Sequence, residues 1–173
     1  MPETKEGMRF IQHEFDEAIA VQQAIVESER SLEKDHPLPN ARQALGEMRG
    51  VDEQQLRTLK DLGKRFGATG KAEEVATGLG ELAKETRTSA EGGPESEQYE
   101  AHAVLLTMKR KQQDSASAVA KIAQKMGDQE LKTAAAEMHK ETKSSADELS
   151  GLLAQLAVQL ASKGEQPQAR ASR

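Results

Sequence analysis

The stretch that decides the fold is N-A-R-Q-A-L-G-E-M-R-G-V-D-E-Q-Q-L-R-T-L-K-D-L-G-K-R-F, which spans residues 40–66. Its apolar side chains recur at steps of three and four, with one double step of eight. This spacing places them on one face of an α-helix. Asn40 is suited to cap the start of such a helix, and Gly67 follows its last apolar residue. The predicted apolar stripe comprises Ala44, Met48, Val51, Leu59, Leu62 and Phe66.

Three further segments, residues 8–34, 96–126 and 129–162, show the same helical spacing. Pro37 and Pro39 separate the first segment from the 40–66 helix, because proline cannot continue the backbone hydrogen bonding of a helix. Residues 67–95 read as a connection with a shorter helix over 71–87, which ends at a Gly-Gly-Pro break. The predicted core comprises Ile11, Phe15, Ile25, Met48, Leu59, Leu62, Val104, Met108, Ile122, Met138, Leu149 and Leu152.

The two halves of the chain echo each other. A shift of 90 residues matches Ala44 with Ala134, Met48 with Met138, Leu59 with Leu149 and Leu62 with Leu152. We infer two copies of one helical hairpin, 8–66 and 96–162, joined by a crossover (67–95) long enough to run the length of a bundle. The predicted fold is therefore all-α: a single antiparallel four-helix bundle of ferritin-like topology over residues 8–162, with a short helix in the crossover.

The composition excludes several other classes. Of 173 residues, only three Phe and one Tyr are aromatic, so an all-β fold is disfavoured. There is no cysteine, which excludes disulfides, thiolate zinc sites and cysteine nucleophiles. The net charge of −5 argues against a nucleic-acid-binding protein. We expect the one dense basic run, residues 109–111, to be a solvated helix face.

The ends of the chain favour a soluble cytoplasmic protein. Residues 2–7 lack the basic start and apolar core of a signal peptide. The most apolar stretch, residues 152–161, is too short to span a bilayer and therefore predicts no membrane partner. The polar tail, residues 163–173, is expected to be disordered.

Three motifs carry a family resemblance: Tyr99-Glu100, the run Gly127-Asp128-Gln129-Glu130-Leu131, and residues 141–149 (ETKSSADEL). They resemble the second half of ferritin-like proteins, and in particular an uncharacterised bacterial family of ferritin-like, stress-associated proteins. That family also has a short helix in the connector, similar to residues 72–84 here. The resemblance covers about residues 8–160. It implies a ferritin-like bundle, in which related enzymes bind iron at mid-bundle through an inward Glu and a Glu-x-x-His pair from each hairpin.

The mid-bundle positions of this chain carry other residue types. Counting along the helices predicts an inward-facing polar layer of Gln22, Asp52, Gln55, Gln112, Ser115, Thr142 and Ser145. Asp52 is the only acid among them, and none is the histidine of a Glu-x-x-His pair. Two iron ions in this layer would lack charge compensation. We therefore predict no metal, no cofactor and no catalytic residues, and expect a non-enzymatic, stress-associated cytoplasmic bundle.

The alternative is a di-metal protein, with iron or manganese and ferroxidase-type chemistry. It would use Glu14, Glu17, Asp52, Glu100 and Glu141, if the helix phases were shifted by one residue.

Two surface features complete the predictions. The four histidines, His13, His36, His102 and His139, are expected to be solvated, although His13 and Glu17 are spaced to hold a metal weakly. Leucines beside the main stripes could form the face of a homodimer, namely Leu45, Leu56, Leu106 and Leu153.

Overall fold

The structure is a computed structural model that describes residues 5–88, 90 and 92–163. The described residues form five α-helices and no strand, which confirms the all-helical class. The helices are α1 (Lys5–Asp35), α2 (Pro39–Lys64), α3 (Glu73–Thr88), α4 (Pro94–Met126) and α5 (Gln129–Lys163). The predicted tail lies outside the described residues beyond Lys163.

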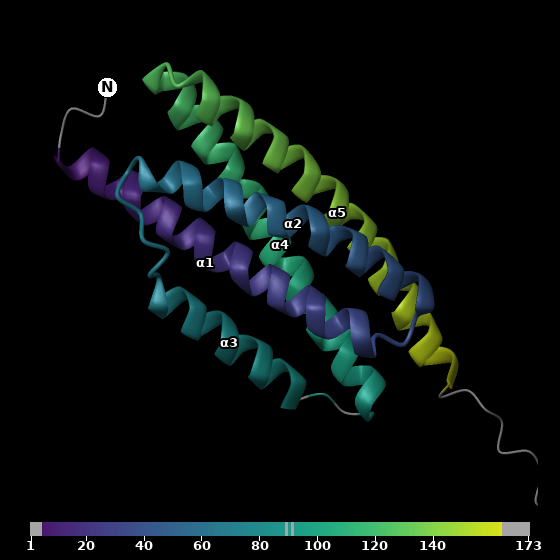
Figure 1. Ribbon diagram of the computed structural model, residues 1–173. Coiled ribbons are helices and arrows are strands. Elements are labelled where there is room, and N and C mark those ends of the chain that lie inside the picture. Colours follow the sequence, from purple (N-terminus) through teal and green to yellow (C-terminus); the bar gives the residue numbers. More distant parts are fainter. Residues whose placement is uncertain (1–4, 89, 91, 164–173) are drawn as a thin grey trace, which may run out of the picture.

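The four long helices pack side by side (Figure 1). Both α1 and α5 contact α2 and α4, whereas α3 lies on the outside against α1 and α4. Side-chain hydrogen bonds show that α1 and α2 are antiparallel, since Gln12 reaches Gly67 while Gln22 reaches Asp52. The helices α4 and α5 are also antiparallel, because His102 contacts Leu149 while His139 contacts Gln113. The segment containing α3 carries the chain from the end of α2 to the start of α4, at the opposite end of the bundle.

The helix ends follow from proline, glycine and aspartate. The helix α2 begins at Pro39, and its N-cap, Leu38, makes no side-chain capping bond. The predicted Asn40 cap is therefore wrong, because proline already fills the first turn; Asn40 Nδ2 instead donates to Gln155 Oε1 on α5 at 3.2 Å. The helix α4 ends at Gly127, whose φ of 73° lies in the left-handed region that favours glycine. Asp128 Oδ1 then accepts a bond from Leu131 N at 3.0 Å and caps α5.

The core consists of two apolar clusters. One gathers Ile11 and Phe15 with Leu59 and Met138, and the other gathers Leu32 with residues of α2, α4 and α5. All the predicted core residues are buried except Ile122, which is partly buried against the first cluster. The neighbouring Ala123 is fully buried instead, so the buried face of α4 is turned by one residue here.

Two predicted apolar positions differ from expectation in opposite ways. Val51 is 44% exposed, although its spacing placed it on the buried stripe. Leu45, predicted on a homodimer face, is fully buried in the core. The other three leucines of that predicted face, Leu56, Leu106 and Leu153, are half-buried.

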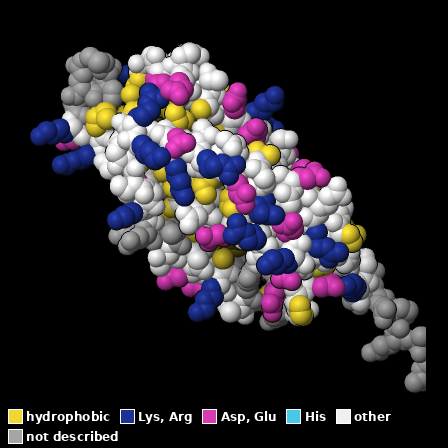
Figure 2. All heavy atoms as spheres, in the orientation of Figure 1, with side chains coloured by type: hydrophobic (Ala, Val, Ile, Leu, Met, Phe, Trp, Pro, Cys, Tyr) yellow, Lys and Arg dark blue, Asp and Glu magenta, His cyan; other side chains and the backbone are white. Residues whose placement is uncertain are grey.

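One face of the bundle shows a mixture of charges. On the face shown in Figure 2, Lys and Arg side chains are interspersed with Asp and Glu. None of the described α3 side chains is fully buried; Val75, Leu79 and Ala83 are partly buried against α1 and α4. No described helix is both long enough and apolar enough to cross a bilayer.

Candidate functional site

A polar layer lies between the two apolar clusters and is made by all four long helices. Five of the residues predicted there are buried: Gln22, Asp52, Gln55, Gln112 and Thr142. Ser145 and Ser115 are half-buried, and Ser115 makes none of the layer's bonds described below. The layer also contains Glu29 and Lys109, both fully buried, which the sequence reasoning missed. We use the name mid-bundle polar layer for these eight residues: Gln22, Glu29, Asp52, Gln55, Lys109, Gln112, Thr142 and Ser145.

The centre of the layer is the ammonium group of Lys109. Its Nζ lies 2.7 Å from Glu29 Oε1 and 3.2 Å from Ser145 Oγ, and it also contacts Asp52 Oδ2. The prediction that Lys109 belongs to a solvated basic face is wrong. Its position explains why: Lys109 lies one turn after Leu105 and three residues before Gln112, so the buried face of α4 passes through it.

Glutamine side chains connect this ion cluster to the surrounding helices. Gln22 Nε2 donates to Asp52 Oδ1 at 2.7 Å and to the Asp52 carbonyl at 3.2 Å. Gln112 Nε2 in turn donates to Gln22 Oε1 at 3.0 Å and to the Ala18 carbonyl at 3.1 Å. These bonds tie α1 to both α2 and α4.

The α2–α5 side of the layer is bonded separately. Gln55 Nε2 donates to Glu141 Oε2 at 2.8 Å, and Thr142 Oγ1 donates to Gln55 Oε1 at 3.4 Å. Glu141 itself is exposed. The layer therefore reaches solvent on this side of the bundle.

The protonation of Glu29 sets the charge of the layer. Burial raises the pKa of Glu29 to about 8; the Lys109 ammonium opposes this shift, and the Asp52 carboxylate adds to it. Apart from its 2.7 Å approach to Lys109, neither Glu29 oxygen makes a hydrogen bond of normal geometry to a described residue. At pH 7 this shift favours the protonated form of Glu29.

These residues do not fit a di-metal centre. A cation bound near Asp52 and Glu29 would have to displace the tethered ammonium of Lys109, because that group already contacts both carboxyls. The remaining groups of the layer are neutral amides and hydroxyls, and no histidine belongs to it. Neutral amides and hydroxyls cannot supply the anionic and imidazole ligands that iron or manganese prefers.

The carboxylates of the di-metal alternative are also not brought together. Glu14 lies between Ile11 and Phe15 at one end of the bundle. Glu100 adjoins Ala101, which belongs to the cluster at the other end.

One small group near the start of α1 has the composition of a metal site. Ligand atoms of His13, Glu14 and Glu17 lie within 4.8 Å of one another. His13 is exposed, and its Nε2 is 3.9 Å from Glu17 Oε2. The Lys111 ammonium already pairs with the other oxygen of Glu17. A cation at this group would therefore compete with a lysine and with water.

The prediction that all four histidines are solvated is wrong for two of them. His13 is exposed and His139 half-buried, but His36 and His102 are fully buried and bonded to each other. The chain does contain one Glu-x-x-His sequence, Glu33 to His36, but it lies at the end of α1 and not at mid-bundle. Glu33 there accepts a bond from Arg49 instead.

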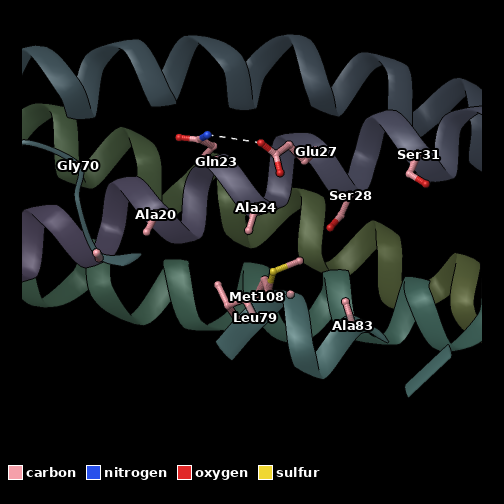
Figure 3. Close-up of a pocket in the computed structure, with 12 residues that line it drawn as sticks. Ala20, Gln23, Ala24, Glu27, Ser28, Ser31, Gly70, Leu79, Ala83 and Met108 are labelled. Carbon is pink, nitrogen blue, oxygen red and sulfur yellow. Dashed lines mark hydrogen bonds between the residues drawn. The ribbon is translucent and has the colours of Figure 1, made fainter. Parts of the chain in front are cut away.

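A pocket of about 400 Å³ lies between α1 and α3 (Figure 3). Figure 3 shows Ala20 and Ala24 of α1 facing it, with Met108 of α4 beneath. Its polar lining comprises Gln23 and Glu27, which approach each other at 3.4 Å, and two serines. No histidine lines the pocket to activate a serine.

Comparisons with protein-family models, with curated proteins and with solved structures find no match to this chain.

Proposed function

We propose that this chain is a non-enzymatic, ferritin-like helical bundle whose mid-bundle polar layer has a structural role. The observation that carries the proposal is the position of Lys109: its ammonium lies against the Glu29 and Asp52 carboxyls, where a metal-binding relative would hold a cation. The ammonium belongs to the chain, so the layer keeps its charge balance without an ion from solution.

The arrangement of the helices supports the ferritin-like part of the proposal. Two antiparallel hairpins are joined by a crossover that runs the length of the bundle, as in ferritin-like folds. Gln22 and Gln112, which are 90 residues apart, bond to each other where α1 meets α4. The repeat that matches residues of α2 with residues of α5 has the same shift of 90. We therefore treat Gln22 and Gln112 as equivalent residues of the two hairpins that meet at the centre, close to a pseudo-two-fold axis.

The ion cluster suits a role in fixing how the helices align. A buried charge pair adds little net stability compared with well-packed apolar residues, but breaking it is costly, so it penalises misaligned packing. Glu29, Asp52, Lys109 and Ser145 come from four different helices. The cluster can therefore form only when all four are in register.

Anaerobic titration with Fe(II), followed by metal analysis, tests the absence of a metal centre. We expect no stoichiometric iron and no oxygen consumption on exposure to air. Stoichiometric iron that is lost in Asp52→Ala, with oxygen consumption by the unsubstituted protein, would contradict the proposal.

The proposal also includes a stress association, which the resemblance implies, a cytoplasmic location, and a homodimer formed through the leucines beside the main stripes. Without Leu45, the remaining face would comprise Leu56, Leu106 and Leu153, which are half-buried. Light scattering should give twice the 18.8 kDa mass of one chain. A mass near that of one chain over a wide concentration range would rule out the dimer.

A further inference from the structure

Two buried histidines connect three parts of the fold at one end of the bundle. His36 lies in the turn between α1 and α2, and its Nε2 is 2.9 Å from His102 Nδ1 on α4. His102 Nε2 is in turn 2.8 Å from the carbonyl of Leu149 on α5. Both rings are fully buried. The pair therefore joins the α1–α2 turn to α4 and α5.

The hydrogen-bond partners determine where the ring protons are. The Leu38 backbone N–H donates to His36 Nδ1 at 3.1 Å, so this nitrogen carries no proton. In a neutral ring, His36 Nε2–H then donates to His102 Nδ1, and His102 Nε2–H donates to the Leu149 carbonyl. All four ring nitrogens are satisfied only when both histidines are neutral. A proton added to His36 Nδ1 would face the Leu38 N–H, and a proton added to His102 Nδ1 would face the His36 N–H.

The charged groups around the pair do not offer it a counter-ion. Arg42 of α2 donates to the His36 carbonyl at 2.9 Å, and its positive charge opposes protonation of His36. Glu95 of α4 is already paired with Lys163 of α5 at 2.6 Å. Asp35 is exposed and forms no ion pair with His36 among the described residues. With Glu95, Arg42 and His36 it lines an open pocket of about 390 Å³, through which protons can reach His36.

We propose that the His36–His102 pair is an acid-released latch that holds the α1–α2 turn against α4 and α5. Protonation of His36 at Nδ1 removes the acceptor of the Leu38 N–H and places an uncompensated charge in the buried site, so this end of the bundle opens while the rest stays folded. In support, burial and the facing His102 lower the pKa of His36 to about 4, and burial lowers the pKa of His102.

The expected size of the pH effect follows from the linkage between protonation of His36 and opening of this end of the bundle. A histidine with a pKa of 6.5 when released and about 4 when latched makes opening about 20-fold more favourable at pH 5 than at pH 7. His102 adds to this in the same direction.

Amide hydrogen exchange of the full chain tests the latch directly. After correction for intrinsic exchange, the Leu38 amide should lose about 20-fold of its protection between pH 7 and pH 5. The amide of Leu59, in the far half of α2, should not change. The latch is wrong if Leu38 keeps its protection at pH 5, or if Leu59 loses protection to the same extent.

A variant isolates the titrating group. Asn at position 36 can still accept from the Leu38 N–H but cannot titrate, so His36→Asn should remove the roughly 20-fold part of the pH dependence of Leu38 exchange that His36 contributes. His13→Asn, which removes an exposed histidine, should leave it unchanged. If His36→Asn does not fold, ¹⁵N spectra of the imidazoles in the unsubstituted protein decide the question. Both buried rings should stay neutral at pH 5.5, and titration of His36 with the ordinary pKa of a histidine would overturn the proposal.

Discussion

At the scale of single residues, the most consequential group is the carboxyl of Glu29. It is fully buried, and its pKa of about 8 is far above the value of 4.5 that it has when exposed. The folded state therefore binds a proton more tightly than the unfolded state. This group contributes stability below pH 4.5, and that contribution is lost as the pH rises through 8.

This loss of stability with rising pH gives a prediction for Glu29→Gln. Between pH 7.5 and 8.5, above the range in which a histidine with the ordinary pKa of 6.5 titrates, the free energy of unfolding of the unsubstituted protein should fall. The reason is that the folded state still holds the Glu29 proton that the unfolded state has already released. In Glu29→Gln the free energy should be nearly flat over this range, because the amide cannot ionise. Urea denaturation at several pH values measures both curves, and parallel curves would show that Glu29 does not titrate in this way.

Some residues of the polar layer could be predicted from the sequence and others could not. Gln22, Asp52 and Gln112 interrupt apolar stripes, so counting along a helix finds them. Glu29 and Lys109 also lie on buried faces, but their charges favour solvent unless a partner is known. Those partners are 80 residues apart along the chain, and only the packing of α1 against α4 brings them together. The His36–His102 pair was missed for the same reason.

At the scale of elements, the long helices could be predicted closely because strong local signals mark them. Pro39 and Gly127 mark two of their ends, and periodic apolar residues fill their interiors. The rotation of a helix about its own axis could be predicted less closely. An apolar stripe allows a rotation by one residue, as at Ile122 and Ala123, and which residue is buried depends on the neighbouring helix.

The short helix α3 is the element with the least packing, since none of its described side chains is fully buried. Gly78 lies within it, and an added Cβ would meet no other atom within 4 Å. Gly78→Ala should therefore stabilise α3 by about 0.5–1 kcal/mol, through a higher helix propensity. Hydrogen exchange of the α3 amides should slow accordingly, and unchanged exchange would contradict this account of α3.

A glycine at a helix end provides the opposite case. Gly127 has a φ of 73°, a conformation that costs a residue with a Cβ about 1–2 kcal/mol. Gly127→Ala should lower the free energy of unfolding by that amount in urea denaturation. A neutral or stabilising effect would mean that the α4–α5 turn does not require the left-handed conformation.

At the scale of the whole molecule, the mid-bundle polar layer lies between two apolar clusters. The layer draws Glu29 from α1, Asp52 from α2, Lys109 from α4 and Ser145 from α5. We propose that the ammonium of Lys109, a part of the chain, holds this layer together in place of a metal ion.

The free energy of unfolding of Lys109→Met tests this claim most directly, with Lys111→Met as the matched control. Lys109→Met leaves the buried Asp52 carboxylate without its cation and should cost about 3–5 kcal/mol. Lys111 is exposed and pairs with Glu17 near the surface, so Lys111→Met should cost at most about 1 kcal/mol. We predict this large difference in metal-free buffer containing a chelator. Equal effects of the two substitutions, or unfolding of the unsubstituted protein by the chelator alone, would contradict the account.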